Sequence, residues 1–281
     1  MDERTLFQTL ADDPEDEAAR VVFADWLLER GDPMSEFISL QAEHRRKPLD
    51  TLRAQRAQDL LIMNWRRWVG PLHRVIHRRS CVFEGGFLRD VEATVPPSDV
   101  LAVRDAPQWS TVRALRIGGA PDRIGSLLES PWLRNLRLLR CEAAAALRLS
   151  TPAFTLDALE LTGSEAVQVE RLPAWERLSR LTLHEFDAPL AALQLTAREL
   201  HVEARQIDQA IILVRAAVHR PERVVVTTWG WKFSISPSGV VASVTNFSNF
   251  EVRAVRALGD LEVEVVFGER VYRGPASRFD W

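Results

Sequence analysis

A short apolar pattern recurs through the middle of the chain at a nearly constant interval. It has the form L-x-x-L-x-L, or a close variant of it, and occurs six times between Val112 and Val226. The copies are the segments 112–117, 133–138, 156–161, 178–183, 197–202 and 221–226. Their central apolar residues stand at positions 115, 136, 159, 181, 200 and 224. A period of about 22 residues predicts one short strand per copy, with successive strands stacked in a parallel sheet.

This spacing is typical of leucine-rich repeats, and it predicts an irregular, loosely curved solenoid over residues 73–228. Only the second copy, with Cys141, has the Asn or Cys that such repeats often place in the turn after the strand. Three copies share a tryptophan and a preceding proline before the strand, which predicts similar corners with core tryptophans. These pairs are Pro107 with Trp109, Pro131 with Trp132, and Pro173 with Trp175.

The N-terminal part has the apolar periodicity and the end signals of helices. Four helices are predicted, over about residues 3–11, 14–30, 33–46 and 49–68. We expect Asp13 to cap the second helix, with Pro14 in its first turn, and Asp32-Pro33 to begin the third helix in the same way. The apolar side of the fourth helix is predicted to consist of Leu52, Leu60, Leu61 and Trp65.

Three segments in this region, residues 13–16, 20–33 and 36–41, keep the order D-P, A-D-W-L-x-E-R-G-D-P and E-F-I-x-L-Q. This order resembles that of the bacterial repeat-companion domain, and Phe23 stands where the family is expected to have Tyr. The resemblance covers about residues 3–46. It implies a helical module ahead of leucine-rich repeats and supplies no catalytic residues. For Asp25-Trp26 we favour a structural role, with Trp26 in the helical core and Asp25 paired or capping, over a docking site.

The segments that flank the repeats carry strand signals. Residues 81–95 are predicted to form either a hairpin that turns at Gly85-Gly86 or, over 87–95, an irregular first repeat strand. Residues 207–219 are predicted to be a helix. Hairpins are expected within 232–245 and 261–273, with a possible helix over 249–258. The predicted fold class is thus α/β, with a helical domain (1–72), the repeat solenoid (73–228) and a β-rich α+β cap (229–281).

Composition and charge narrow the classes of function. The chain has a hydrophobic fraction of 46%, two cysteines without a C-x-x-C motif, no secretory signal, and no apolar run near the roughly 18 residues that a membrane span needs. These features predict a cytoplasmic protein with no membrane partner. The net charge of −3 hides a strongly acidic segment, 1–43, followed by a strongly basic one, 44–79. The basic segment, with Trp65 and Trp68, could bind nucleic acid, but its acidic neighbour can neutralise it, so nucleic acid is not the favoured partner.

Motifs that carry chemistry are absent from the sequence. It contains no phosphate-binding loop, dinucleotide fingerprint, H-E-x-x-H motif or nucleophile elbow. His73, His77 and Cys81 have a spacing of four that could suit a metal, but a solvated basic stretch is the favoured interpretation. We therefore predict a protein that is not an enzyme and has no cofactor or metal.

What remains is the face that the predicted strands turn outward. Residues between the buried leucines alternate to the opposite side of the sheet. The candidate partner-binding residues on this concave face are Arg116, Arg137, Glu160, Thr182, His184, His201 and Glu203. A broad polar face suits protein recognition, so we predict an interaction or scaffold protein with another protein as its partner. The alternatives are nucleic-acid binding through residues 44–79 and an enzyme of unrecognised type.

Overall fold

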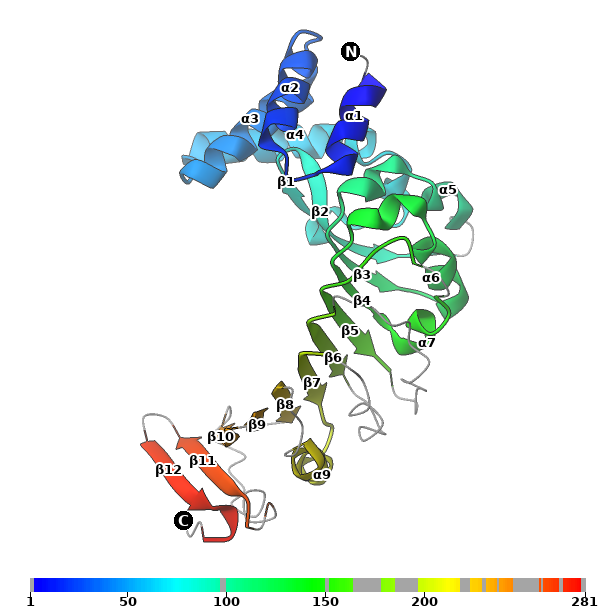
Figure 1. Cartoon of the computed structure of the whole chain (residues 1–281). Coiled ribbons are helices and arrows are strands. Elements are labelled where there is room, and N and C mark those ends of the chain that lie inside the picture. The colour runs from blue at the N-terminus through cyan, green and yellow to red at the C-terminus, as the bar shows by residue number, and fades with distance from the viewer. Residues whose placement is uncertain are drawn as a thin grey trace. The chain divides into compact units, whose positions relative to one another are not determined.

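The fold is mixed α/β (Figure 1). The computed structural model of the chain describes residues 3–96, 100–149, 152–163, 178–184, 197–217, 223–228, 231–236, 238–244, 258, 260–267 and 270–278. These ranges contain eight α-helices and twelve strands, and the strand order of the open sheet follows the order of the chain. The chain divides into two compact units. Unit 1 comprises Met1–Leu139 and Ser150–Thr155, and unit 2 comprises Arg140–Leu149 and Leu156–Trp281.

Unit 1 begins with four helices, α1 (Glu3–Asp12), α2 (Glu17–Leu28), α3 (Pro33–Arg46) and α4 (Thr51–Val69). The last three are each capped by an aspartate whose carboxylate accepts a first-turn backbone N–H. These caps are Asp16, Asp32 and Asp50. The expectation that Asp13 caps the second helix is wrong. Its carboxylate instead accepts the N–H of Glu15 and its carbonyl accepts that of Asp16, so Asp13 closes a turn before the helix begins.

Helices α1, α2 and α3 pack around an apolar cluster. Its buried members are Leu6, Leu10, Phe23, Leu27, Ile38 and Phe87. Trp26 lies at the edge of the cluster, with its ring stacked on Phe23 and the Arg30 guanidinium 3.7 Å from its ring centroid. Asp25 is expected to pair or to cap a helix. Its exposed carboxylate instead makes no hydrogen bond or ion pair with any described residue.

The apolar side of α4 starts later than predicted. Leu60 is buried, whereas the side chain of Leu52 is 82% exposed. The first half of α4 contacts α3 through charged side chains instead. Arg53 pairs with Glu43, and Arg56 makes two hydrogen bonds to Glu36, at 2.6 and 2.7 Å.

A hairpin follows the helices, after two short 3-10 helices, η1 (Gly70–Arg74) and η2 (Arg78–Ser80). Strand β1 (Val82–Glu84) pairs antiparallel with β2 (Phe87–Thr94), and the turn between them is Gly85-Gly86. Strand β2 also pairs in parallel with β3 (Ala114–Gly118), with Val91 opposite Leu115. The predicted hairpin is therefore confirmed, and β2 also begins the parallel series of strands.

Short helical segments lead into the next strands of unit 1. Helices α5 (Val100–Arg104) and α6 (Pro121–Leu128) lie on the same side of β3 (Figure 1). The 3-10 helices η3 (Pro107–Thr111) and η4 (Pro131–Asn135) each begin at a proline. Trp109 is fully buried, and its indole N–H donates to the Val103 carbonyl at 2.8 Å. The third predicted corner, at Pro173 and Trp175, lies outside the described residues.

The strand of the second copy is displaced from its predicted place. We expected it to be centred on Leu136, but β4 spans Leu138–Glu142, and its buried residues are Leu139 and Cys141. Leu136 instead directly follows η4, as its C-cap residue, and is buried there. The turn that starts at Pro131 uses three more residues than the sequence pattern suggests, so Leu139 takes the central position.

Unit 2 contains an in-register parallel series, β5 (Ala158–Thr162), β6 (Arg180–His184), β7 (Glu199–Glu203) and β8 (Arg223–Thr228). The central residues of these strands stand directly opposite one another and are buried; they are Leu159, Leu181, Leu200 and Val224. A short helix, α7 (Ala143–Ala146), follows β4. Helix α9 (Ile207–Ala217) precedes β8, as predicted up to Ala217.

The remaining strands of unit 2 reverse direction more often. They are β9 (Trp231–Ser236), β10 (Gly239–Val244), β11 (Glu262–Phe267) and β12 (Arg270–Pro275), followed by η7 (Ala276–Arg278). Strands β9 and β10 form one hairpin and β11 and β12 another, which confirms both predicted hairpins. Strand β9 is antiparallel to β8, and β10 is parallel to β11. The helix considered over 249–258 lies outside the described residues except for Leu258.

Candidate functional site

The outward face of β5 to β8 in unit 2 carries rows of polar side chains, here called the strand face. Because neighbouring strands are parallel and in register, side chains at equivalent positions form rows across the sheet. One row contains Glu160, Thr182 and His201, and the next contains Thr162, His184 and Glu203. A row that the sequence analysis did not consider contains Ala158, Arg180, Glu199 and Arg223. Five of the predicted partner-binding residues therefore belong to one surface.

A chain of charged contacts runs along the strand face. The Glu203 carboxylate lies 2.7 Å from Nδ1 of His184. The other ring nitrogen of His184 lies 3.9 Å from the Glu160 carboxylate, which in turn lies 3.6 Å from the Arg140 guanidinium. The imidazole thus stands between two carboxylates. The side chains of His184 and Glu160 are about three-quarters covered, whereas that of Glu203 is 53% exposed.

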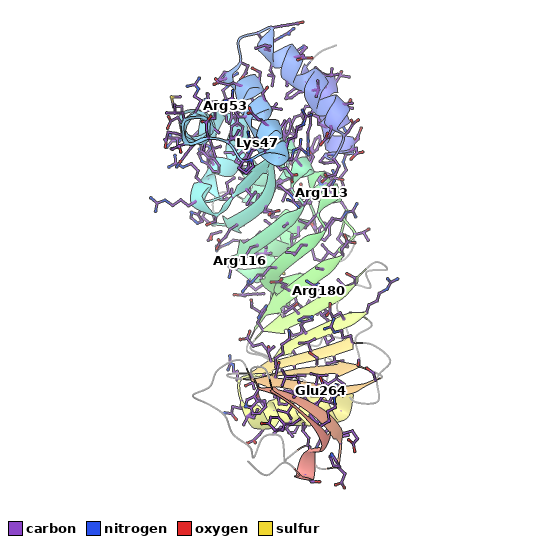
Figure 2. The ribbon with its side chains drawn as sticks, turned by 90° about the vertical axis from the view of Figure 1, so that its left-hand side faces the viewer. Lys47, Arg53, Arg113, Arg116, Arg180 and Glu264 are labelled. Carbon is purple, nitrogen blue, oxygen red and sulfur yellow. The ribbon has the colours of Figure 1, made fainter. Side chains whose placement is uncertain are left out.

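A second group on the strand face centres on Glu199. Its carboxylate lies 3.1 Å from Nε2 of His201 and 3.4 Å from the guanidinium groups of both Arg180 and Arg223. Figure 2 labels Arg180 among the side chains that β6 presents. His201 is the main cause of a lowered pKa of the Glu199 carboxyl, and the two arginines add to the effect. The carboxylate is therefore held in its charged form.

The two arginines predicted at the start of the face belong to unit 1. Arg116 stands on β3 (Figure 2), and its guanidinium lies 3.9 Å from the Glu92 carboxylate of β2. Arg137 precedes β4, and its guanidinium donates to the Thr155 carbonyl at 3.2 Å. Because the strand is displaced by three residues, Arg140 takes the outward position that was predicted for Arg137.

Sequence reasoning missed Arg140, Arg180, Glu199 and Arg223 for two different reasons. Arg180, Glu199 and Arg223 lie two residues before Thr182, His201 and Val225, so strict alternation within each strand would have found them. Arg140 required the correct register of β4, which the repeated leucines do not determine.

The strand face offers ion pairs and hydrogen bonds to a partner. Its carboxylates are each next to a histidine or an arginine, and it presents both signs of charge on rigid strands. Within the described residues, no group of three or more His, Cys, Asp or Glu side chains is arranged to hold a metal ion.

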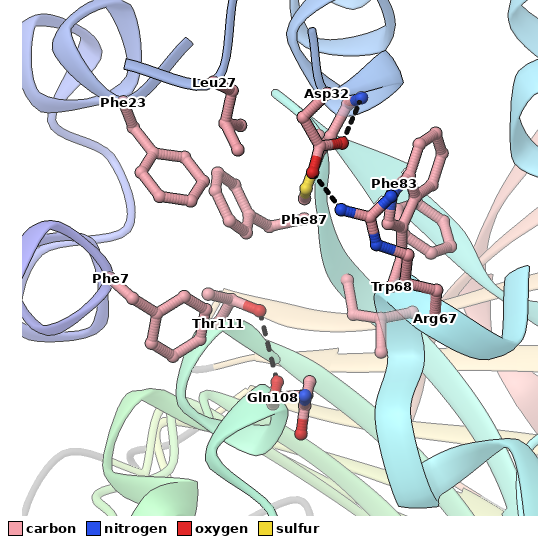
Figure 3. Close-up of a pocket in the computed structure, with 13 residues that line it drawn as sticks. Phe7, Phe23, Leu27, Asp32, Arg67, Trp68, Phe83, Phe87, Gln108 and Thr111 are labelled. Atoms are coloured by element: carbon pink, nitrogen blue, oxygen red, sulfur yellow. Dashed lines mark hydrogen bonds and ion pairs between the residues drawn. The ribbon is translucent and has the colours of Figure 1, made fainter. Parts of the chain in front are cut away.

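A separate cavity lies inside unit 1, where α2 and α4 approach β2 (Figure 3). Its volume is about 200 Å³, and the rings of Phe7, Phe23 and Phe87 point into it. Some polar groups at its wall have protein partners, whereas Trp68 Nε1 and Gln108 Oε1 are buried without a hydrogen-bond partner among the described residues. The Asp32 carboxylate accepts the Met34 N–H at 3.0 Å and pairs with Arg67. The cavity is thus a gap in an aromatic core whose polar wall is satisfied only in part.

Two further findings concern the chain as a whole. No helix in the ranges that the structure describes has both the length and the apolar character needed to cross a bilayer. Comparison with protein-family models, with curated proteins and with solved structures found no match to this chain.

Proposed function

We propose that this chain is a non-enzymatic interaction protein that binds another protein through the strand face. In this proposal, residues 3–46 act as a repeat-companion-like helical module, and the strands that follow are degenerate leucine-rich repeats of a cytoplasmic scaffold. The in-register alignment of Leu159, Leu181 and Leu200 supports the repeat interpretation. It gives each copy one strand with its leucines buried on one side and its polar residues on the other.

The charged rows of the strand face are the observation on which the proposal depends. Glu160, His184 and Glu203 contact one another in sequence across three strands, on a backbone fixed by ladder hydrogen bonds. Charges held in fixed positions give a protein interface its register and its selectivity more than its raw affinity. The complementary partner would carry basic residues opposite Glu203, which is the most exposed carboxylate of this group.

The experiment uses the full chain with a photo-crosslinking amino acid at Thr182, in the middle of the strand face. Its control carries the same amino acid at Asp208, an exposed residue of α9 in the same unit. We expect one protein to be crosslinked in stoichiometric yield when the photo-crosslinking amino acid is at position 182. The same protein should not be crosslinked when it is at position 208.

The affinity of that protein is then measured for two matched charge reversals. Glu203→Arg should weaken binding by about tenfold or more, which corresponds to about 1.4 kcal/mol, because it repels the basic surface expected on the partner. Asp208→Arg makes the same change of charge and should leave the affinity within about twofold. Equal effects of the two reversals, or no partner at all from position 182, would refute the proposal.

The nucleic-acid alternative is weakened by the ion pairs of the basic segment. Four of its arginines, Arg45, Arg53, Arg56 and Arg67, pair with carboxylates of the acidic segment. Those carboxylates belong to Glu17, Glu43, Glu36 and Asp32. Charge that is compensated within the protein releases few counterions from a phosphate backbone, so it contributes little affinity for DNA or RNA.

A further inference from the structure

A wide groove in unit 1 is surrounded by basic side chains. It lies between the second half of α4 and the segment through η1 and η2, and its volume is about 770 Å³. Four arginines line it, Arg66, Arg67, Arg78 and Arg79, together with His73 and His77. No aspartate or glutamate is among its lining residues. The groove therefore collects positive charge without an acidic side chain of its own.

Three of these arginines differ from the ion-paired arginines of the basic segment. Arg67 is paired with Asp32, but Arg66, Arg78 and Arg79 are exposed and make no hydrogen bond or ion pair with a described residue. Arg66 lies in the last turn of α4, where the helix dipole favours a cation. Arg78 and Arg79 lie in η2 and have no such stabilisation, so their charges remain available to an anionic ligand.

Apolar side chains adjoin the same groove. Ile62 and Met63 are 43% and 66% exposed on α4, on the turn before Arg66. Trp65 also lines the groove, but its ring makes an edge contact with Phe83, with centroids 6.0 Å apart. The most exposed apolar side chains of the groove are thus aliphatic, while Trp65 is half-buried. A flexible methionine suits the side chains of a peptide, whereas single-stranded nucleic acid needs exposed aromatic rings for stacking.

We propose that this groove binds an acidic peptide segment that also carries aliphatic side chains, supplied by a partner protein. Its carboxylates would pair with Arg66, Arg78 and Arg79, and its aliphatic side chains would cover Ile62 and Met63. Arginine suits this role because its planar guanidinium can bind a carboxylate through two parallel hydrogen bonds. The site is in unit 1 and does not depend on the strand face of unit 2.

The test measures binding of fluorescent peptides to the full chain by anisotropy at low salt. The probe is a peptide of about 16 residues built from alternating Glu-Glu and Leu-Leu pairs. One control peptide has every Glu replaced by Gln, and another has every Leu replaced by Ser. We expect the Glu/Leu peptide to bind at least about tenfold more tightly than either control, because the groove offers both charge and aliphatic surface. Binding should also weaken as salt is added.

Matched variants locate the site. The double variant Arg78→Ser/Arg79→Ser removes two groove charges and should weaken binding of the Glu/Leu peptide about tenfold or more. Arg53→Ser/Arg56→Ser removes the same charge from arginines that already have carboxylate partners and should change binding by less than about twofold. Circular dichroism checks that both variants are folded. Met63→Ser should weaken binding of the Glu/Leu peptide. It should leave binding of the peptide whose leucines are replaced by serine unchanged.

Three peptide results would overturn the proposal. They are equal binding of the three peptides, no binding of the Glu/Leu peptide, and equal effects of the two double variants. Binding of a labelled oligothymidine, measured in the same assay, supplies a fourth test. If the oligothymidine binds more tightly than the Glu/Leu peptide and loses binding in Arg78→Ser/Arg79→Ser, the groove is a nucleic-acid site instead. Glu203→Arg, which changes the strand face, should leave peptide binding to the groove unchanged. A failure of the groove proposal can therefore be distinguished from a failure of the strand-face proposal.

Discussion

The glycine pair at the β1–β2 turn lets the hairpin approach the helices of unit 1. Both residues have positive φ, 57° at Gly85 and 91° at Gly86. A Cβ at Gly86 would lie 2.2 Å from Cγ1 of Ile38 in α3. Gln41 of the same helix donates to the Phe83 carbonyl at 3.0 Å and accepts the Gly86 N–H at 2.7 Å. The absence of side chains at the turn is therefore what allows α3 to bond to it.

Gly86→Ala should lower the free energy of unfolding by about 3 kcal/mol, because it adds a backbone penalty and a clash with a buried side chain. Gly31→Ala is the matched control. Gly31 also has a positive φ, 64°, but an added Cβ there meets no atom within 4 Å. It should cost only about 1 kcal/mol. Urea denaturation followed by circular dichroism measures both values, and similar losses for the two variants would contradict the close packing of the turn.

For single residues, the sequence predicted some helix caps but not the salt bridges between helices. Aspartates before helices were recognised as caps, and Asp32 has that role. Asp13 and Asp16 are both chemically able to cap, and only the turn between them decides that Asp16 does so. The salt bridges of α4 with α3 could not be predicted in detail, because they depend on how two helices are placed side by side.

Among the elements, the helices and the strand positions followed from periodicity, while register did not always do so. The segment from Leu133 to Cys141 contains two overlapping matches to the repeat pattern, one centred on Leu136 and one on Leu139. Both bury leucines, so the apolar pattern alone does not distinguish them. The length of η4 decides between them, and with that decision Arg140 replaces Arg137 on the strand.

The ion pairs between strands make a prediction about pH. The pKa of Glu199 is lowered in the folded chain by His201, and then by Arg180 and Arg223. A lowered folded pKa contributes stability that is present above the unfolded pKa, about 4.3, and is lost as pH falls through the folded value. Glu199→Gln should therefore have a lower free energy of unfolding than the natural chain at pH 5. The difference between the two free energies should shrink as the pH falls below about 4.

Urea midpoints measured between about pH 3 and pH 5 test this dependence. Glu262→Gln serves as the control, since Glu262 is an exposed residue of β11 that makes no ion pair with a described residue. This substitution should change the urea midpoint little, because it removes no ion pair with a described residue. A difference for Glu199→Gln that stays constant with pH would contradict the assigned role of His201 and the two arginines.

At the scale of the whole molecule, each compact unit contains one cysteine. Cys81 belongs to unit 1, and its thiol donates to the His77 carbonyl at 3.2 Å. Cys141 belongs to unit 2 and is 2% exposed. Burial raises the pKa of Cys81 to about 11 and that of Cys141 to about 12. Each thiol is therefore held in its unreactive, protonated form.

Iodoacetamide at pH 8 should modify both cysteines slowly in the folded chain, because only the thiolate attacks the reagent. Cys81 should react before Cys141, since it is less buried and its pKa is lower. Peptide mass spectrometry of timed samples gives the two rates separately, and the urea-unfolded chain gives the rate of an exposed thiol. A folded-state rate for Cys141 equal to its unfolded rate would contradict its burial on β4.

The in-register pairing of β5 to β8 separates the buried leucines from the polar residues on the opposite side of the sheet. Leu159, Leu181 and Leu200 occupy one side, and every substitution at positions 160, 182 and 201 falls on the other. Randomised libraries at these outward positions should thus give many folded variants with new specificities. Display selection from such libraries could then yield variants of this chain that bind new target proteins.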